Sequence, residues 1–80
     1  MKVITVEKML PGSSAVISEI FGEPLVKRRL MEMGVLPGSV LKLIKWAPLG
    51  DPAECQIRGY KLSIRRSEAA MISVSVEGSE

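Results

Sequence analysis

The feature that most constrains this chain's fold is a hairpin signal at Gly59, within the stretch from residue 46 to residue 66. Glycine suits the first central position of a two-residue type II′ turn, because that position needs a positive φ. A turn at Gly59-Tyr60 predicts four cross-strand pairs that match polar with polar and apolar with apolar: Arg58 with Lys61, Ile57 with Leu62, Gln56 with Ser63, and Cys55 with Ile64. Such pairs indicate one buried face and one wet face, so the stretch predicts an antiparallel β-hairpin.

The segment before the hairpin, residues 47–53, predicts a rigid loop. Pro48 and Pro52 lock φ and lack an N–H donor, so they exclude this segment from the middle of a sheet. Between the two prolines, Leu49-Gly50-Asp51 would project as a short finger. An apolar side chain on a stiff loop loses little entropy on binding, which makes Leu49 a candidate partner contact. The alternative is that Leu49 folds back over the end of the fold and closes it, since single leucines at surfaces are common.

Between Gly22 and Gly34 the apolar spacing changes from two residues to about 3.6, which predicts a helix of about three turns. Pro24 suits the first helical position, and Gly34 suits the left-handed position just after the last turn. One helical face collects the residues expected to be buried: Leu25, Val26, Leu30 and Met33. A helix this short needs a sheet beneath it.

The remaining apolar patterns predict three more strands, over residues 14–21, 40–46 and 71–76. Thr5 and Ser67 are expected to cap two short helical turns, over residues 5–10 and 66–70. Five short strands predict a mainly β fold, and closure into a small barrel would remove exposed sheet edges. With one helix between the first and second strands, an SH3-like barrel of about five strands fits best, and an OB-fold is the alternative.

Composition narrows the class of protein. Eighty residues form a single domain, 1–80, in which residues 78–80 are expected to be a frayed tail. The net charge of +2 is too small to indicate nucleic-acid binding by itself. The single cysteine fits a reducing compartment. Charge appears too early for a signal peptide, and no apolar run is long enough for a membrane span, so we expect a cytoplasmic location.

Several short motifs follow one another from about Thr5 to Val76. They are Leu10-Pro11-Gly12, Arg29-Leu30, Glu32-Met33-Gly34, Pro37-Gly38, Ala47-Pro48-Leu49-Gly50-Asp51-Pro52, Arg58-Gly59-Tyr60, Leu62, Ile64-Arg65, Glu68-Ala69 and Ile72 with Val74. Pro-Gly pairs are weak signals, whereas the finger motif followed by Arg-Gly-Tyr at this spacing is much more specific. In these motifs and their order, the chain closely resembles the FeoA family, the small ferrous iron transport protein A.

The resemblance implies an SH3-like barrel that works with FeoB, a membrane transporter of Fe²⁺ coupled to a G protein. It implies an accessory or regulatory role at the cytoplasmic side of FeoB, so that this protein reaches the membrane only through its partner. The same barrel also resembles the carboxy-terminal domain of metal-dependent repressors, which leaves a stand-alone interaction module as an alternative. Because a fold alone does not give function, the link to iron uptake comes from the family.

The residue types argue against an intrinsic metal, cofactor or catalytic site. Fe²⁺ favours imidazole and carboxylate ligands, but the chain has no histidine, and Asp51, Glu54 and Glu68 lie in different segments. Sulfur-bearing side chains are expected to pack in the core: Cys55, Met31, Met33 and Met71. The sequence shows no nucleophile–histidine pair and no phosphate-binding glycine loop. We therefore expect no enzymatic activity, no metal site and no cofactor.

These exclusions leave a protein-interaction module. We expect one contact surface that joins the finger to the hairpin end, with a basic helix face as a second patch. The candidate residues are Leu49, Asp51, Arg58 and Tyr60 in the first, and Arg28 and Arg29 in the second.

Arginines could also act on the partner. Arg28, Arg29 and Arg65 are candidates for a side chain that reaches into the partner's GTP site, with ordinary solvated charge as the alternative. Nucleic acid is the competing partner class. Only three aromatic residues are present, and no basic stripe runs between them, so we do not expect nucleic-acid binding.

Overall fold

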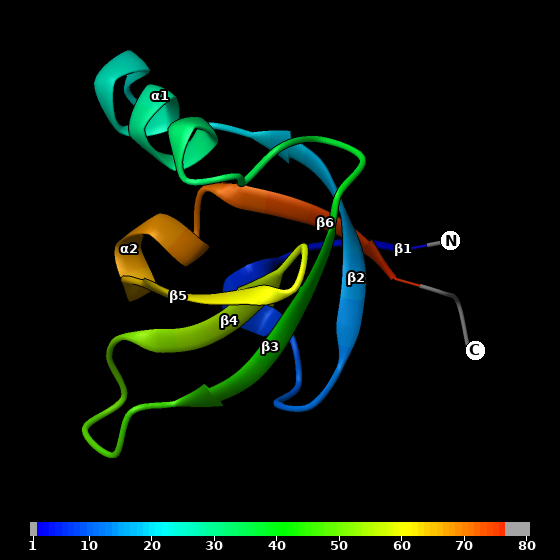
Figure 1. Cartoon of the computed structure of the whole chain (residues 1–80), viewed down its shortest axis with the longest axis vertical. Coiled ribbons are helices and arrows are strands. Elements are labelled where there is room, and N and C mark those ends of the chain that lie inside the picture. The colour runs from blue at the N-terminus through cyan, green and yellow to red at the C-terminus, as the bar shows by residue number, and fades with distance from the viewer. Residues whose placement is uncertain (1, 77–80) are drawn as a thin grey trace.

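One curved antiparallel sheet dominates the computed structural model, which describes residues 2–76 (Figure 1). The expected tail, 78–80, lies outside the described residues. The strands follow the order β1-β6-β2-β3-β4-β5 across the sheet. Their bounds are β1 Lys2–Thr5, β2 Ser14–Ile20, β3 Val40–Trp46, β4 Ala53–Ile57, β5 Tyr60–Ile64 and β6 Ile72–Val76. The mainly β barrel predicted from the sequence is confirmed, although β1 and β5 do not pair and remain the two edges of the sheet.

Helical segments occupy three of the connections. They are the 3₁₀ turn η1 (Val6–Lys8), the helix α1 (Pro24–Glu32) and the single turn α2 (Arg66–Ala69). The sequence prediction omitted β1, so α1 follows the second strand and not the first. The omission has a physical cause. β1 has four residues and no clear alternation, and it is a strand because it pairs with β6 at the far end of the chain.

The β4–β5 hairpin forms with a different turn from the one predicted. Arg58 and Gly59 are its central residues, with φ values of 53° and 88°, which is the type I′ pattern. Ile57 therefore pairs with Tyr60 and Cys55 with Leu62, so the predicted register is wrong by two residues. A shift of two leaves every side chain on its predicted face. The observed register is favoured because it gives Tyr60 a partner and adds a fifth cross-strand pair.

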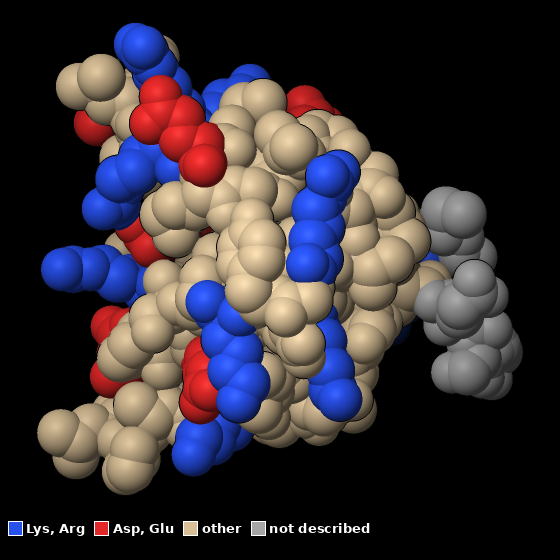
Figure 2. Space-filling model, in the orientation of Figure 1, with Lys and Arg blue, Asp and Glu red and all other residues tan. Residues whose placement is uncertain are grey.

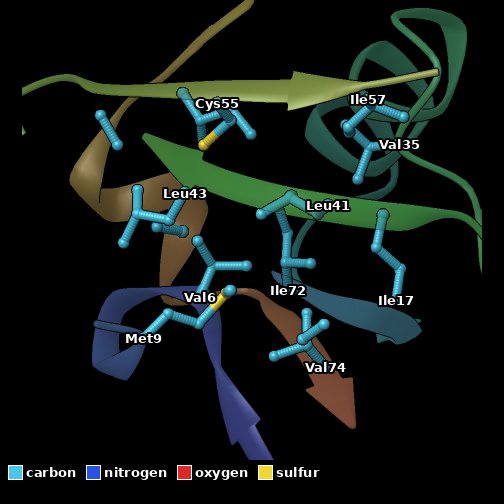
Figure 3. Close-up of a cluster of buried hydrophobic side chains, with 14 of the residues drawn as sticks. Val6, Met9, Ile17, Val35, Leu41, Leu43, Cys55, Ile57, Ile72 and Val74 are labelled. Atoms are coloured by element: carbon cyan, nitrogen blue, oxygen red, sulfur yellow. The ribbon is translucent and has the colours of Figure 1, made fainter. Parts of the chain in front are cut away.

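The core lies inside the curve of the sheet (Figure 3). Alternate residues of the central strands face inward, as a period of two requires. The largest side chains that are fully buried there are Ile17, Leu41, Leu43, Ile57, Ile64, Ile72 and Val74, with Leu30 and Val35 entering from the helix and its C-terminal turn. This arrangement leaves one connection, α1, largely outside the core.

Helix α1 lies at one end of the sheet, with only part of one face against it (Figure 1). Leu30 is its one buried residue. The expected buried stripe is wrong at Leu25, which is 77% exposed, while Val26 and Met33 are half-buried. Met31, expected in the core, is 36% exposed. The apolar residues of α1 extend beyond the part of the helix that packs on the barrel, because the helix contacts the barrel mainly through its C-terminal half.

Candidate interaction surface

The finger loop, residues 47–52, projects from the start of β4 and presents Leu49. The Leu49 side chain is 97% exposed, so the alternative in which it folds back over the barrel is wrong. Two backbone hydrogen bonds close the loop on itself. The Gly50 N–H donates to the Ala47 carbonyl at 2.7 Å, and the Ala47 N–H donates to the Pro52 carbonyl at 2.9 Å. The loop thus has internal structure although it contains no helix or strand.

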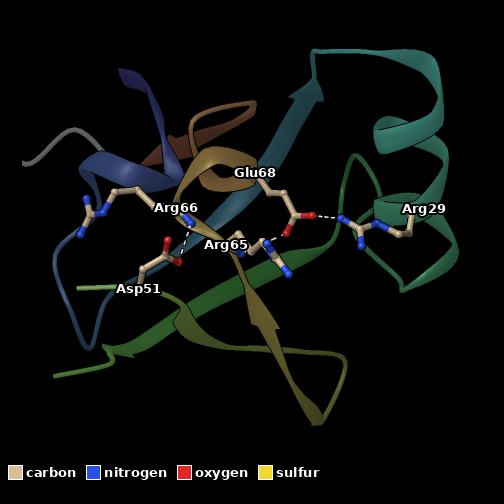
Figure 4. Close-up of polar contacts among 5 residues, drawn as sticks. All are labelled: Arg29, Asp51, Arg65, Arg66 and Glu68. Carbon is tan, nitrogen blue, oxygen red and sulfur yellow. Dashed lines mark hydrogen bonds and ion pairs between the residues drawn. The ribbon is translucent and has the colours of Figure 1, made fainter. Parts of the chain in front are cut away.

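Arg66, the first residue of α2, braces the finger loop from outside. Its guanidinium donates from Nε and Nη2 to the Gly50 carbonyl, at 3.1 and 2.9 Å. Its plane lies over the Trp46 ring, 4.0 Å from the centroid, which is cation–π geometry. Its backbone N–H donates to Oδ1 of Asp51 at 3.0 Å (Figure 4). Arg66 therefore contacts the chain on both sides of the exposed Leu49.

Sequence reasoning missed this role for Arg66, and it missed the internal hydrogen bond of Asp51. The Asp51 carboxylate accepts a hydrogen bond from within the molecule, so it acts as a cap for α2 as well as a surface group. No local signal links residues 51 and 66, because the fold alone brings them together. The spacing in the chain gives no indication of the contact.

Glu68 forms the second polar centre of the surface. The residue is 6% exposed, and its carboxylate accepts from the Arg65 N–H at 3.0 Å and forms an ion pair with Arg29 of α1 (Figure 4). The predicted cap, Ser67, is wrong. The N-cap residue is Arg65, because Glu68 three residues later reaches back to its N–H, as the acidic half of a capping box does. The three-residue spacing from Arg65 to Glu68 could therefore have been recognised in the sequence.

The hairpin tip contacts the loop between α1 and β3. The Arg58 Nε donates to Oγ of Ser39 at 3.3 Å. Tyr60 is 54% exposed, and its hydroxyl lies over Gly34, where a Cβ would be 3.1 Å from the oxygen. Gly34 is therefore needed both for its φ of 100° and for the space above it. Tyr60 is partly a packing residue at this position.

The structure separates the residues that the sequence placed on one surface. Leu49 and Asp51 precede β4, whereas Arg58 and Tyr60 follow it. A strand of five residues spans about 13 Å, so the finger and the hairpin tip lie at opposite ends of β4. Each contacts a different neighbour, the finger α2 and the tip the loop between α1 and β3.

The basic helix face is neutralised in part. Arg28 pairs with Glu32 at 3.3 Å on the exposed side of α1, and Arg29 pairs with Glu68. Figure 2 shows Lys and Arg side chains interspersed with Asp and Glu along the side of the molecule that carries the helices. The face has mixed charge, which suits a protein partner better than a polyanion.

Three large apolar side chains on or next to α1 are exposed, which the sequence analysis did not predict. Phe21 is 50% exposed, Leu25 77% and Met31 36%. Met31 also lines a shallow depression of about 390 Å³ with Pro24, Lys27, Arg28 and Glu32. Single exposed apolar side chains are common at protein surfaces, so the depression beside Met31 is the stronger candidate contact of this region.

Cys55 lies in the middle of β4 and is buried. Burial, with a smaller effect from the negative charge of Glu54, raises the pKa of its thiol to about 11. At neutral pH the thiol is protonated, so it is a poor nucleophile and a poor metal ligand. Within residues 2–76, no cluster of three or more His, Cys, Asp or Glu side chains has a metal-binding arrangement. The described helices include none with the length and apolar character of a membrane span.

Comparison with known proteins places this geometry in a family. The family model described as the FeoA domain matches residues 4–76. An Fe(2+) transport protein A/Fe(2+) transporter FeoB fusion protein of Porphyromonas gingivalis is 37% identical over 65 residues. That match covers 81% of this chain and 8% of the much longer relative.

Solved structures match the whole barrel. The NMR structure of an FeoA-like protein from Clostridium acetobutylicum is 37% identical and gives a TM-score of 0.87 over 95% of this chain and 88% of that one. The crystal structure of Stenotrophomonas maltophilia FeoA, described as a prokaryotic SH3 domain protein complexed with zinc, is 25% identical. Its TM-score is 0.78, over 90% of this chain and 89% of that one. The predicted SH3-like fold is thereby confirmed.

Proposed function

This chain belongs to the FeoA family, which is linked to ferrous iron transport, and we propose that it is an accessory protein that binds an FeoB-type Fe²⁺ transporter. The observation that carries the proposal is the Porphyromonas gingivalis relative, whose name joins the two proteins in one chain. Two proteins that are fused in one organism often form a complex as separate chains in another. The proposed site of action is the cytoplasmic side of the transporter.

The mode of action is binding and regulation without catalysis. The candidate contacts are side chains suited to protein surfaces, an exposed leucine on a braced loop and a mixed-charge helix with apolar neighbours. An apolar anchor held in one conformation loses little entropy on docking, and such anchors dominate interface energetics. We propose Leu49 as the anchor, because it combines nearly full exposure with the hydrogen bonds that fix its loop.

The proposal is tested with purified protein and its detergent-solubilised FeoB partner by biolayer interferometry. Leu49→Asp should weaken binding at least about tenfold, since it removes an anchor worth about 1.4 kcal/mol or more. Leu10→Asp is the matched control, because Leu10 is 75% exposed but lies in the turn before β2. Its binding should equal that of the wild type. Wild-type protein that fails to bind would refute the partnership, and equal binding by Leu49→Asp would refute the anchor.

An effect on GTP turnover is a separate readout. Arg28 and Arg29 are engaged with Glu32 and Glu68, which leaves Arg65 as the candidate without a carboxylate partner among residues 2–76. If an arginine acts in the GTP site, Arg65→Ala should lower the stimulated turnover of FeoB about 10³-fold or more while binding persists. Unchanged turnover would leave Arg65 as a surface charge.

A further inference from the structure

The outer edge of β5 carries backbone groups that no neighbouring strand takes up. β5 is the last strand in the sheet order, with β4 on one side only. A type I′ loop closes on the hydrogen-bonded pair Ile57–Tyr60, and the pattern then alternates, so Lys61 and Ser63 direct their N–H and C=O groups away from β4. No other backbone hydrogen bond within residues 2–76 uses these groups. Both residues are exposed.

Positive charge flanks this edge at both ends. Arg58 precedes β5 in the turn, and Arg65 follows it. Of the ion pairs among residues 2–76, none includes either arginine, whereas Lys61 in the middle pairs with Glu54 of β4 at 3.7 Å. In Figure 4 the Arg65 side chain extends from the end of β5 on the side of α1. Two arginines without an ion-pair partner in the described part of the chain therefore lie beyond the two ends of β5, and the Arg58 side chain is hydrogen-bonded to Ser39, before β3.

We propose that the β5 edge is a docking site for an extended, acidic segment of a partner protein, which adds to the sheet as a further strand. The donors and acceptors of Lys61 and Ser63 would pair with the backbone of the segment, as in other cases of strand addition. Carboxylates six positions apart in the segment would reach Arg65 and Arg58, with the Arg58 side chain exchanging its hydrogen bond to Ser39 for the carboxylate. The half-buried Leu62 and the exposed ring of Tyr60, on the inner face, would contact alternate apolar residues.

Charge also argues against a second copy of this chain as the occupant. Antiparallel pairing of two β5 edges would bring Arg58, Lys61 and Arg65 of one copy near the same residues of the other. Like charges across a strand pair are destabilising, and a lysine on an edge strand disfavours self-pairing. The inference rests on the sheet alone and does not require that the partner be a transporter.

A defined peptide tests the site. The probe is an acetylated and amidated peptide with two aspartates flanking five alternating valine and threonine residues, titrated into ¹⁵N-labelled protein. The largest shifts should fall on the Lys61 and Ser63 amides, which should also exchange more slowly in deuterated solvent. The same peptide with lysines in place of the aspartates should bind at least about tenfold more weakly, because it meets Arg58 and Arg65.

Two variants separate strand addition from charge attraction. Ser63→Pro removes the outward N–H and leaves pairing with β4 intact, since an edge position tolerates proline when its N–H faces solvent. This variant should weaken binding of the aspartate peptide about five- to tenfold, which corresponds to the loss of one hydrogen bond. Ser63→Thr keeps the donor and should bind as the wild type does.

The other outcomes would overturn the inference. Equal binding of the two peptides, shifts confined to α1, or unchanged binding by a folded Ser63→Pro variant would show that the β5 edge is not the site. Concentration-dependent dimerisation in sedimentation, with broadening of the Lys61 and Ser63 amides before any peptide is added, would assign the edge to a second copy. The proposed partnership with FeoB is tested by binding of the wild-type protein to solubilised FeoB, independently of these results.

Discussion

The finger loop and helix α1 both project from the barrel, but different kinds of contact hold them in place. The loop has no regular structure, yet Arg66 ties it to α2 through the Gly50 carbonyl, and its side chain stacks on Trp46. The helix satisfies its own backbone, yet only Leu30 enters the core, and the Arg29–Glu68 ion pair ties it to α2. Regular structure and firm attachment are therefore separate properties in this molecule.

The difference indicates that the two regions would contribute to binding in different ways. A surface that is rigid before binding gains affinity because little order remains to be imposed, whereas a surface held by few contacts adapts its shape. The finger fits the first description and α1 fits the second. The predictions below test this contrast through stability, from the largest expected effect to the smallest.

The largest effect should come from Leu30→Ala. Removing a fully buried leucine leaves a cavity and should lower the free energy of unfolding by about 2–4 kcal/mol, measured by urea denaturation. If α1 is held as loosely as its exposure indicates, its amide protons should lose protection from exchange well before those of the sheet. Leu25→Ala is the control on the same helix, and it should change stability by less than about 0.5 kcal/mol. Equal losses for the two variants would contradict the packing described for α1.

Alkaline pH should loosen both regions together, because Cys55 lies in β4 between the finger and the hairpin tip. Folding raises the pKa of this thiol from its ordinary value of 9.0 to about 11, so the folded state holds the proton more tightly. The contribution to stability is complete below about pH 9 and is lost as the pH rises toward 11. The free energy of unfolding should fall by up to roughly 2–3 kcal/mol over this window.

Cys55→Ala provides the comparison for the pH series, since it removes the titrating group. Its stability should start lower, but its decline between pH 9 and 11 should be shallower than that of the wild type. Parallel curves would mean that Cys55 does not cause the decline.

The Arg29–Glu68 ion pair, which attaches α1 to α2, should contribute less to stability than the buried Leu30 does. Glu68→Gln keeps the acceptor for the Arg65 N–H and removes the charge that holds Arg29. Because Arg29 is more than half exposed, we expect a loss of about 1–2 kcal/mol in the free energy of unfolding. Arg28→Gln breaks an exposed pair on the same helix and should cost less than about 0.5 kcal/mol. A larger loss of stability for Arg28→Gln than for Glu68→Gln would contradict the conclusion that the Arg29–Glu68 ion pair attaches α1.

The sequence predicts what is local and periodic. The five longer strands, the start of α1 at Pro24 and the left-handed Gly34 all follow from spacing and turn chemistry. The hairpin register escaped prediction because type I′ and II′ turns differ by placing glycine second or first, and matched faces fit both. A tripeptide such as Arg58-Gly59-Tyr60 cannot distinguish them without its tertiary neighbours.

The candidate surface was less predictable than the fold, since its contacts join distant segments. Leu49 was named as a candidate because its two flanking prolines predict a stiff loop, whereas its exposure could be decided only from the structure. The roles of Arg66 and Glu68 depend on partners 15 to 39 residues away, and no periodicity encodes such distances. The apolar neighbours of α1 look like core residues in the sequence, and only the placement of the helix exposes them.

The smallest and most local effect should come from Arg66→Ala. The substitution removes the guanidinium contacts with Gly50 and Trp46 and the ion pair with Glu7. It keeps the backbone N–H that donates to Asp51. Because the side chain is 44% exposed, we expect a loss of about 1 kcal/mol in global stability. The sharper readout is the Gly50 amide, whose exchange should accelerate about tenfold or more while the α1 amides stay unchanged. Arg66→Lys should behave almost like alanine, since a lysine lacks the planar fork that bonds one carbonyl twice and stacks on an indole. If the Gly50 amide remained protected in Arg66→Ala, the internal hydrogen bonds of the finger would suffice to hold it, and the contrast with α1 would rest on the loop's own backbone.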